Sequence, residues 1–477
     1  MEFIQKLVDA ANTIIWSYCI LILAIGVGLY YLIRTRGVQF RKLGEIIRLV
    51  FGKEAQTDAD KAAGSAEGGI KGLQSLFVAV GGCVGTGNVA GVALAITAGG
   101  PGAVFWMWVI GLLGAGTSFI ENTLAQVFKE HDERGGFRGG PAYYMEKGLG
   151  KRWVGIVFAV CMILSFGMAL AALQANTISE AWVGALGCSK WVSTIIIVAF
   201  AAVVIYGGAK RIAKVSEIIV PTMAIVYLIA ALIVLVINVK HIPAMFAAIF
   251  NGAFNVKALG GGAVGTAILQ GVKRGVFSSG AGQGDSPQAS ASAVTTHPAR
   301  QGLIQSFAIY IDTILICSAT AFVCISAQSG DTDLAGIKMV QASFASAFGD
   351  WAKIFIALIM FLFCFSSLIA NYYYAESNLA FILRGNKGRN LYRIVFLLVL
   401  LWGGLSGLGI VWDFADVFGG SLAVVNLIVL VFLGNISVEI LKDYESQEKA
   451  GIAVPTFNIK SIEKYDLSNA ADCWKDK

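Results

Sequence analysis

Long apolar runs with very few charges recur along the whole chain, and each is about as long as a membrane-crossing helix. A helix needs about 20 apolar residues to cross the hydrocarbon core of a bilayer. Eleven such segments are predicted, at 14–33, 70–98, 102–128, 153–183, 192–209, 216–239, 258–296, 302–327, 351–383, 394–412 and 417–441. The strands of a membrane barrel would be shorter and would alternate apolar with polar residues. The sequence therefore predicts an all-α polytopic membrane protein with about 11 transmembrane segments.

The charges support this class and also indicate an orientation. Only 14% of the 477 residues are charged and 57% are hydrophobic, whereas soluble domains carry about 25% charged residues. The net charge of +6 lies in short basic clusters, which begin with 34–48 and alternate with loops poor in Lys and Arg. This alternation predicts a multi-pass protein of the cell membrane with its N-terminus outside and its C-terminus in the cytoplasm. It does not indicate a nucleic-acid partner.

Few residues in the chain are suited to catalysis or to a structural metal. The eight cysteines show no metal spacing, and the three histidines (His131, His241 and His297) all fall in predicted loops. No nucleophile with a neighbouring base is evident from the sequence. We therefore expect no enzyme activity and no cofactor, which leaves transport or channel function.

Two glycine-rich stretches interrupt the apolar segments at matching positions. Residues 85–88 read Gly-Thr-Gly-Asn, and residues 282–285 read Gly-Gln-Gly-Asp. In each copy a proline, Pro101 or Pro298, follows the second glycine by 14 residues. Paired breaks of this kind in the two halves of a chain indicate the binding site of a secondary transporter. The glycines also form small-residue packing motifs, so close helix packing is the alternative interpretation.

The two breaks divide the chain into halves of opposite direction. The loop charges place segment 70–98 from inside to outside and segment 258–296 from outside to inside. This predicts a 5+5 inverted repeat after one extra N-terminal helix. The expected regions are an N-terminal helix with a cytoplasmic amphipathic stretch, two five-helix repeats and a polar cytoplasmic tail, at 1–69, 70–239, 240–441 and 442–477.

Three acidic residues lie inside apolar segments, where a charge is costly and usually functional. Asp312 lies near the middle of its segment and can bind a cation, relay a proton or pair with Lys273 or Arg274. Glu121 and Glu376 lie nearer the cytoplasmic ends, which is typical of an inner gate or a structural ion pair.

At these residues the chain resembles the alanine/glycine:cation symporter family. The stretch 84–108, VGTGNVAGVALAITAGGPGAVFWMW, is close to the family's signature, and the resemblance extends over about 70–441. It includes Gln174-Ala175-Asn176, 274–278 and the tyrosines at 372–374. The resemblance implies the leucine-transporter-type fold and import of small neutral amino acids with sodium or protons.

The chain departs from the family pattern in the substrate region. After Ser278 the family usually has Asn-Glu-Ala-Gly, whereas this chain has Ser-Gly-Ala-Gly at 279–282. Asp285 stands where the family often has a serine, and Asn371 where it commonly has an aromatic residue. An aromatic wall and one carboxylate are lost, so the pocket can admit a larger or more polar side chain.

We therefore expect a secondary active transporter that carries a small neutral amino acid such as alanine or glycine together with a cation, expected to be sodium. The alternatives are proton coupling, a larger or polar substrate such as glutamine or serine, and, less favoured, a channel. The expected substrate-binding residues are Thr86, Gly87, Asn88, Gln174, Phe277, Ser279, Gly282 and Asn371. The expected sodium ligands are Gly81, Val84, Ser366 and Ser367, and Asp312, Glu121 and Glu376 are expected to couple or gate.

Overall fold

The computed structural model describes residues 2–52, 70–132, 135–254, 263–327, 334–385 and 388–475. The start of predicted segment 258–296 and residues 53–69 of the N-terminal stretch lie outside this described part. Within it, the secondary structure is almost all helical, with one short antiparallel hairpin of β1 and β2.

The helices follow one another with short connections. The N-terminal region contains α1 (Glu2–Asn12), η1 (Thr13–Ile20), α2 (Leu21–Arg34), α3 (Val38–Arg41) and α4 (Leu43–Phe51). The next region contains α6 (Gly72–Cys83), η2 (Gly87–Gly91), α7 (Val92–Gly99), α8 (Gly102–Val127), β1 (Glu130–His131), β2 (Phe137–Arg138), α9 (Pro141–Leu149), α10 (Arg152–Leu164), η3 (Ser165–Leu170), α11 (Ala171–Leu186), α12 (Lys190–Ile205) and α13 (Gly208–Ile237).

The second half begins with short helices and continues with long ones. It contains η4 (Val239–His241), α14 (Ile242–Phe254), α15 (Ala263–Ser279), α16 (Ser286–Ser292), α17 (Pro298–Ile309), η6 (Tyr310–Cys317), α18 (Ser318–Ser326), α19 (Ile337–Phe348), α20 (Trp351–Leu383), α21 (Arg389–Leu405), α22 (Leu408–Lys449), η7 (Ile459–Ser461) and η8 (Asp472–Trp474).

Seven helices of the described part are long and apolar enough to cross a membrane. They span Val8–Arg34, Gly102–Val127, Arg152–Leu186, Gly208–Ile237, Pro298–Ser326, Trp351–Leu383 and Gly409–Lys449. An eighth is the bent pair Gly72–Cys83 and Gly87–Gly99, and the apolar helix Lys190–Ile205 is shorter. The all-helical membrane class is thus confirmed, whereas the count of eleven crossings and the 5+5 repeat stay predictions.

Both predicted breaks are present in the structure. The axis of the first apolar helix of the repeat bends by 50° where α6 ends at Cys83 and η2 begins at Gly87. In the second, α15 ends at Ser279 and α16 begins at Ser286. Gly280 has φ +65°, a left-handed value that a residue with a side chain adopts only at a cost. Glycine at these positions thus allows the backbone to leave the helix.

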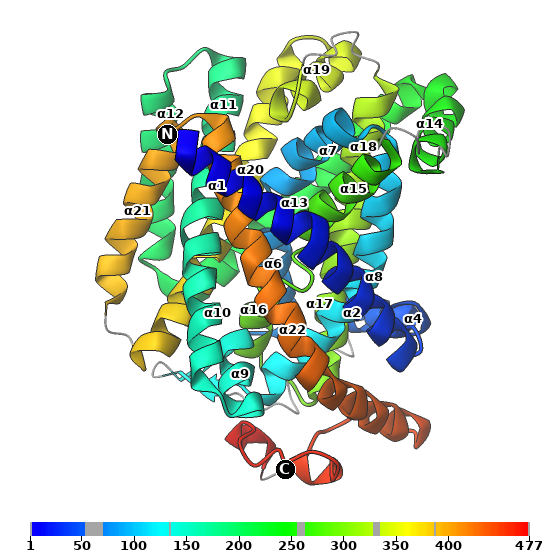
Figure 1. Ribbon diagram of the computed structural model, residues 1–477, viewed down its shortest axis with the longest axis vertical. Helices are drawn as coiled ribbons and strands as arrows, with labels where there is room; N and C mark the ends of the chain where they lie inside the picture. Colours follow the sequence, from blue (N-terminus) through cyan, green and yellow to red (C-terminus); the bar gives the residue numbers. More distant parts are fainter. Residues whose placement is uncertain are drawn as a thin grey trace.

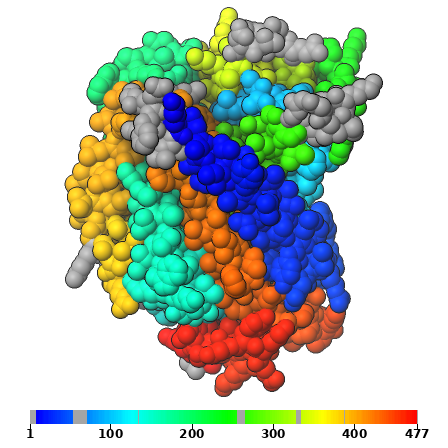
Figure 2. Space-filling model, in the orientation of Figure 1, coloured from blue at the N-terminus to red at the C-terminus, as the bar shows by residue number. Residues whose placement is uncertain are grey.

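The broken helices lie at the centre of the bundle. α6 packs against α13, α16, α17 and α20, while α15 packs against α7 and α8. α22 runs past this core, and α2 crosses over it (Figure 1), as does the blue N-terminal band in Figure 2. The Tyr31 hydroxyl fixes this crossing by donating to the Leu430 carbonyl oxygen at 2.5 Å. The broken segments are therefore shielded from lipid, as backbone outside a regular helix requires.

The outer helices have apolar surfaces suited to lipid. Large hydrophobic side chains are exposed along α2, α12, α13 and α21, for example Ile22, Ile195, Leu232 and Leu398. A water-soluble protein rarely exposes so much contiguous apolar surface. This surface supports the membrane class independently of helix length.

The polar tail after α22 folds back against the end of the bundle, at the bottom of Figure 1. Trp474 is 1% exposed, and its indole N–H donates to the Gln126 carbonyl oxygen at 2.9 Å. The Phe457 N–H donates to the Thr296 carbonyl oxygen at 3.0 Å. The tail thus contacts the ends of α8 and the α16–α17 connection, which its polar sequence does not predict.

Candidate functional site

Four oxygen atoms converge where α6 ends beside α20. The Ser367 hydroxyl lies 3.0 Å from the Gly81 carbonyl oxygen and 3.0 Å from that of Val84. The Ser366 hydroxyl lies 3.2 Å from the Gly81 oxygen. All four residues are buried. The structure therefore brings together the oxygens that the sequence assigned to sodium, from two helices far apart in the chain.

The N–H groups freed by the first break are already hydrogen-bonded. The Gly85 N–H donates to Asn88 Oδ1 at 2.9 Å. The Thr86 N–H and hydroxyl both donate to Gln174 Oε1, at 3.0 Å and 2.8 Å. Gln174, in α11, thus accepts both hydrogen bonds from Thr86. A substrate carboxylate bound to Thr86 would replace Gln174 Oε1 as the acceptor.

A small cavity of about 20 Å³ lies between the two breaks. Gly87, Gln174, Phe277 and Asn371, all predicted to bind substrate, line it. Its other lining residues are Gly82, Cys83, Phe166, Leu170, Ser278, Gly280 and Asp285. A space of this size holds on the order of one water molecule. An amino acid therefore fits only after Phe277 or its neighbours move.

Ser279 and Gly282, which were expected to bind substrate, do not line this cavity. The Ser279 hydroxyl accepts the Ala281 N–H at 3.3 Å and faces a separate small cavity beside α8. The Gly282 N–H donates to Glu121 Oε1 at 3.2 Å, and the Gly282 carbonyl oxygen accepts from Asn426 Nδ2 at 3.1 Å. The left-handed glycines turn this loop so that both residues face α8 and α22 rather than the cavity.

The same contacts fix the Glu121 side chain beside the loop of the second break. Its Oε2 accepts from Asn426 Nδ2 at 2.8 Å, and no ion pair to Glu121 is found among the described residues. The side chain holds the loop of the second break in place and is not part of an ion pair in the described residues, whereas its role as a gate stays a prediction. Asn426, which the sequence reasoning missed, completes this contact from α22.

Asp312 sits at the centre of a network of uncharged donors. Asn88 Nδ2 donates to its Oδ1 at 2.5 Å, and the Ser278 and Thr313 hydroxyls donate to its Oδ2 at 2.7 Å and 2.9 Å. Asn88 therefore points toward Asp312 and does not line the cavity. The network links both breaks to η6, so a change at Asp312 would reach both.

Lys273 and Arg274 have another partner than Asp312. Arg274 forms two hydrogen bonds to Asp416, at 3.0 Å and 3.1 Å, and Lys273 Nζ lies 2.6 Å from the same carboxylate. The predicted alternative of pairing with Asp312 is thus wrong. Asp416 is 3% exposed and lies in α22, whereas the sequence placed it, with Asp413, in the connection between predicted segments 394–412 and 417–441 and gave no sign of this role.

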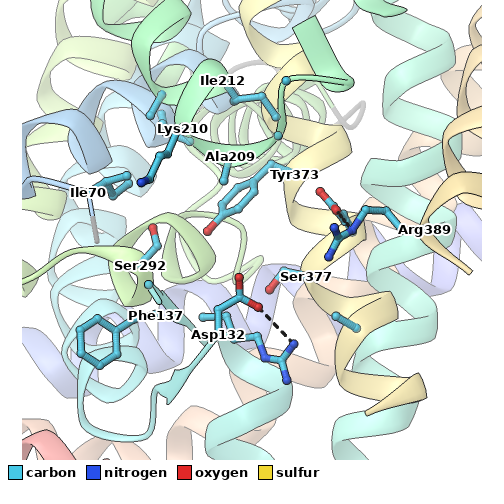
Figure 3. Close-up of a pocket in the computed structure, with 18 residues that line it drawn as sticks. Ile70, Asp132, Phe137, Ala209, Lys210, Ile212, Ser292, Tyr373, Ser377 and Arg389 are labelled. Atoms are coloured by element: carbon cyan, nitrogen blue, oxygen red, sulfur yellow. Dashed lines mark hydrogen bonds and ion pairs between the residues drawn. The ribbon is translucent and has the colours of Figure 1, made fainter. Parts of the chain in front are cut away.

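A larger chamber of about 300 Å³ lies beyond Tyr373, at the end of the molecule that contains the β1–β2 hairpin (Figure 3). Its wall contains two ion pairs, Asp132 with Arg138 at 3.5 Å and Glu376 with Arg389. The Tyr373 hydroxyl donates to the Gln288 carbonyl oxygen at 3.3 Å. Glu376 is therefore in an ion pair outside the central cavity, which agrees with one of its two expected roles.

Comparison with known proteins identifies the family. The sequence profile of the sodium:alanine symporter family matches residues 1–459. The chain belongs to this family.

Several members of the sodium:alanine symporter family are similar to this chain over nearly its whole length. The amino-acid carrier protein AlsT of Bacillus subtilis is 43% identical and covers 100% of this chain and 99% of its own. The probable sodium/glutamine symporter GlnT of the same organism is 41% identical, covering 99% and 96%. The sodium/alanine symporter AgcS of Methanococcus maripaludis is 37% identical, covering 94% and 99%.

A solved structure agrees with the fold. The crystal structure of MhsT in complex with L-phenylalanine matches with a TM-score of 0.55 at 13% identity, covering 80% of this chain and 92% of that chain. The leucine-transporter-type fold is thus confirmed. The chain is a multi-pass membrane transporter of the cation-coupled amino-acid symport class, and it is not an enzyme.

Proposed function

We propose that this protein imports a small neutral amino acid, such as alanine or glycine, together with sodium across the cell membrane. The cluster formed by Gly81, Val84, Ser366 and Ser367 carries this proposal. The Ser367 hydroxyl lies 3.0 Å from both carbonyl oxygens and the Ser366 hydroxyl 3.2 Å from that of Gly81, so the cluster offers uncharged oxygens to a small cation. Unwound carbonyls at membrane depth coordinate sodium in transporters of this type.

The cluster also explains how ion binding would affect the substrate. Val84 and Thr86 lie within the same short break, and Thr86 is tied to Gln174, which lines the cavity. Sodium bound to the cluster would hold α6 and α20 together and fix the end of the break. Substrate binding and ion binding then support one another, as coupling requires.

Transport also needs access from both sides of the membrane. Phe166 and Phe277 line the small cavity, and Tyr373 lines the 300 Å³ chamber. Movement of one set of helices against the other would open the cavity toward this chamber. The chamber would then be the exit toward the cytoplasm.

The orientation is part of the proposal. The two chain ends lie toward opposite ends of the long axis (Figure 1), which supports ends on opposite sides of the membrane, and the basic loops place the N-terminus outside and the C-terminus in the cytoplasm. Epitope tags at each end, probed in intact and permeabilised cells, test it. Staining of the C-terminal tag alone in intact cells would reverse the assignment, and staining of both tags would contradict ends on opposite sides.

Uptake into proteoliposomes tests the function directly. Purified protein should accumulate labelled alanine or glycine against a concentration gradient only when sodium is higher outside. Saturation with substrate would distinguish the transporter from a channel. Uptake of neither amino acid under any ion gradient would refute the proposal.

Proton coupling is the second candidate, and Asp312 favours it. This buried carboxylate lies between both breaks and accepts only uncharged donors. If uptake follows a pH gradient and ignores sodium, Asp312→Asn should abolish accumulation while leaving substrate exchange intact. Retained accumulation in that variant would remove Asp312 as the proton carrier.

The substrate alternative is glutamine or serine. It is favoured by Asn371, whose amide lines the cavity, and by the similarity to a probable sodium/glutamine symporter. Competition of unlabelled glutamine and serine against labelled alanine separates the two. Stronger competition by glutamine than by alanine would replace the first choice.

A further inference from the structure

The carboxylate of Asp285 is an unusual group in the wall of the central cavity. It is 1% exposed and lies between the second break and α16. No hydrogen bond within the described part of the chain reaches its Oδ1. Its Oδ2 accepts from the thiol of Cys83 at 3.5 Å, which is a weak donor, and the carboxylate otherwise interacts with the backbone N–H groups of Ser286 and of Asp285 itself.

Other buried carboxylates in the bundle are better satisfied. Asp312 accepts three hydrogen bonds from uncharged side chains, and Glu121 accepts bonds from Gly282 and Asn426. Asp416 is paired with Arg274 and Lys273. A buried carboxylate held only by a thiol and by backbone N–H groups of its own turn is costly, whereas each of these three has side-chain donors from other helices.

The fold itself brings the Asp285 carboxylate into the cavity. A Cβ at position 280 would lie 2.4 Å from Asp285 Oδ2 and 2.6 Å from Oδ1, so a side chain there would collide with the carboxylate. Gly280 thus leaves the space that the carboxylate occupies. No Lys, Arg or His in the described residues forms an ion pair with Asp285, and the two cations nearest in sequence are bound to Asp416.

A second acceptor faces the same space. Asn371 is 1% exposed, lines the cavity from α20, and its Oδ1 also has no hydrogen-bond partner in the described structure. Two buried side-chain oxygens, Asp285 Oδ1 and Asn371 Oδ1, thus have no hydrogen-bond partner among the described residues, and their side chains line one cavity. Together they fit a ligand that presents N–H groups, because such a group can donate to both oxygens at once.

We propose that Asp285, assisted by Asn371, binds a nitrogen group of the transported amino acid and thereby helps to select the substrate. This rests on the proposed amino-acid transport and adds to it the group that the pocket recognises. An N–H group can come from the α-ammonium of any amino acid or from a side-chain amide such as that of glutamine. A molecule without a suitably placed N–H would leave Asp285 Oδ1 buried without a donor and would be rejected.

The test compares Asp285→Asn with wild type in proteoliposomes and in detergent. The variant keeps the size of the side chain and removes its charge. Direct binding of labelled alanine and glutamine is measured together with uptake. A hydrogen bond to a charged group is stronger than one to a neutral group, so the variant should bind about 10- to 100-fold more weakly. A matched control is Asp350→Asn, which removes an exposed carboxylate outside the bundle core.

The two substrates distinguish the nitrogen that is bound. An equal loss for alanine and glutamine assigns the contact to the α-ammonium. A loss for glutamine alone assigns it to the side-chain amide, and methionine, which is similar in length but lacks the amide, should then be unaffected. Unchanged binding of both substrates by folded Asp285→Asn would overturn the proposal.

Folding and function are checked separately. Size-exclusion profiles and thermal unfolding in detergent show whether Asp285→Asn is folded, and Asp285→Ser provides a second, smaller variant. If wild type binds and transports neither amino acid, the proposed function fails. If wild type transports and both Asp285 variants match it, only the role of Asp285 fails.

Discussion

The two helix breaks have similar glycine-rich sequences but leave different groups unsatisfied. In the first, the freed N–H groups of Gly85 and Thr86 are bonded to side chains, and the carbonyl oxygens of Gly81 and Val84 gather with hydroxyls of α20. In the second, Glu121 and Asn426 hold the Gly282 backbone, but Asp285 Oδ1 has no hydrogen-bond partner among the described residues. The first break thus suits a cation among neutral oxygens, and the second suits an N–H group of the substrate.

This difference teaches that a repeated sequence motif does not fix the role of its copies. Asn88 and Asp285 hold equivalent places in the two motifs. The neutral Asn88 side chain contacts Asp312 through its amide N–H, which a carboxylate does not have. Asp285 instead has Cys83 beside it and Gly280 facing it. The partners on neighbouring helices decide which polar groups of each copy are left free of strong contacts.

The largest effect is expected from filling the first break. A Cβ at Gly85 would lie 2.3 Å from the Ser367 hydroxyl and 2.9 Å from the Gln174 amide. Gly85→Ala should displace both groups and lower sodium-driven uptake by about 100-fold, since overpacking costs about 1–3 kcal/mol. Gly26→Ala is the control, because a Cβ there meets nothing within 4 Å. Uptake equal to that of the control would place the ion site elsewhere.

A smaller effect is expected from removing the hydroxyls themselves. Ser366→Ala with Ser367→Ala should raise the sodium concentration for half-maximal uptake by about tenfold, because two oxygen ligands are lost. Sodium titration of uptake measures it. The control pair is Ser179→Ala with Ser193→Ala, a buried serine pair joined at 2.9 Å away from the break. Unchanged sodium dependence in the first pair would refute the assignment.

The third-largest effect is expected from Asn371, which lines the cavity between the two breaks. Asn371→Trp should fill part of the cavity and shift preference toward glycine and alanine over glutamine by at least several-fold, since about 1–3 kcal/mol accompanies each methylene in an apolar pocket. A competition series with glycine, alanine, serine and glutamine measures the order. Leu358→Trp, on the exposed face of the same helix, is the control. An identical order in wild type and Asn371→Trp would show that Asn371 does not contact substrate.

The smallest effect is expected where the two breaks meet. The Cys83 thiol approaches the Ser279 carbonyl oxygen at 3.4 Å and Asp285 Oδ2 at 3.5 Å. Cys83→Ser supplies a stronger donor, which should occupy the carboxylate and raise the substrate concentration for half-maximal uptake by about two- to threefold. Substrate titration at saturating sodium measures the change. A tighter apparent affinity would show that Asp285 works better when it is already hydrogen-bonded.

The membrane class, the two breaks and the sodium cluster could be predicted from the sequence. Apolar length determines which segments can cross lipid, because unpaired backbone groups are not tolerated there. Glycine clusters mark where a helix ends, since they weaken it by about 1 kcal/mol per residue. The family signature then assigned Ser366 and Ser367 to the partner helix of Gly81 and Val84, and the structure places all four together.

Only the tertiary structure decided which polar side chains face one another. Asp416 lies more than 140 residues after Lys273 and Arg274, yet it pairs with both because α22 passes the segment before the second break. Ser279 and Gly282 were expected in the pocket, but the left-handed glycines turn them toward α8 and α22. The periodicity of apolar residues predicts which face of a helix is buried. The partner of a buried charge depends instead on how helices distant in the sequence pack together. That packing is why Asp285 faces the cavity without a strong donor, and the sequence alone showed only that it was unusual.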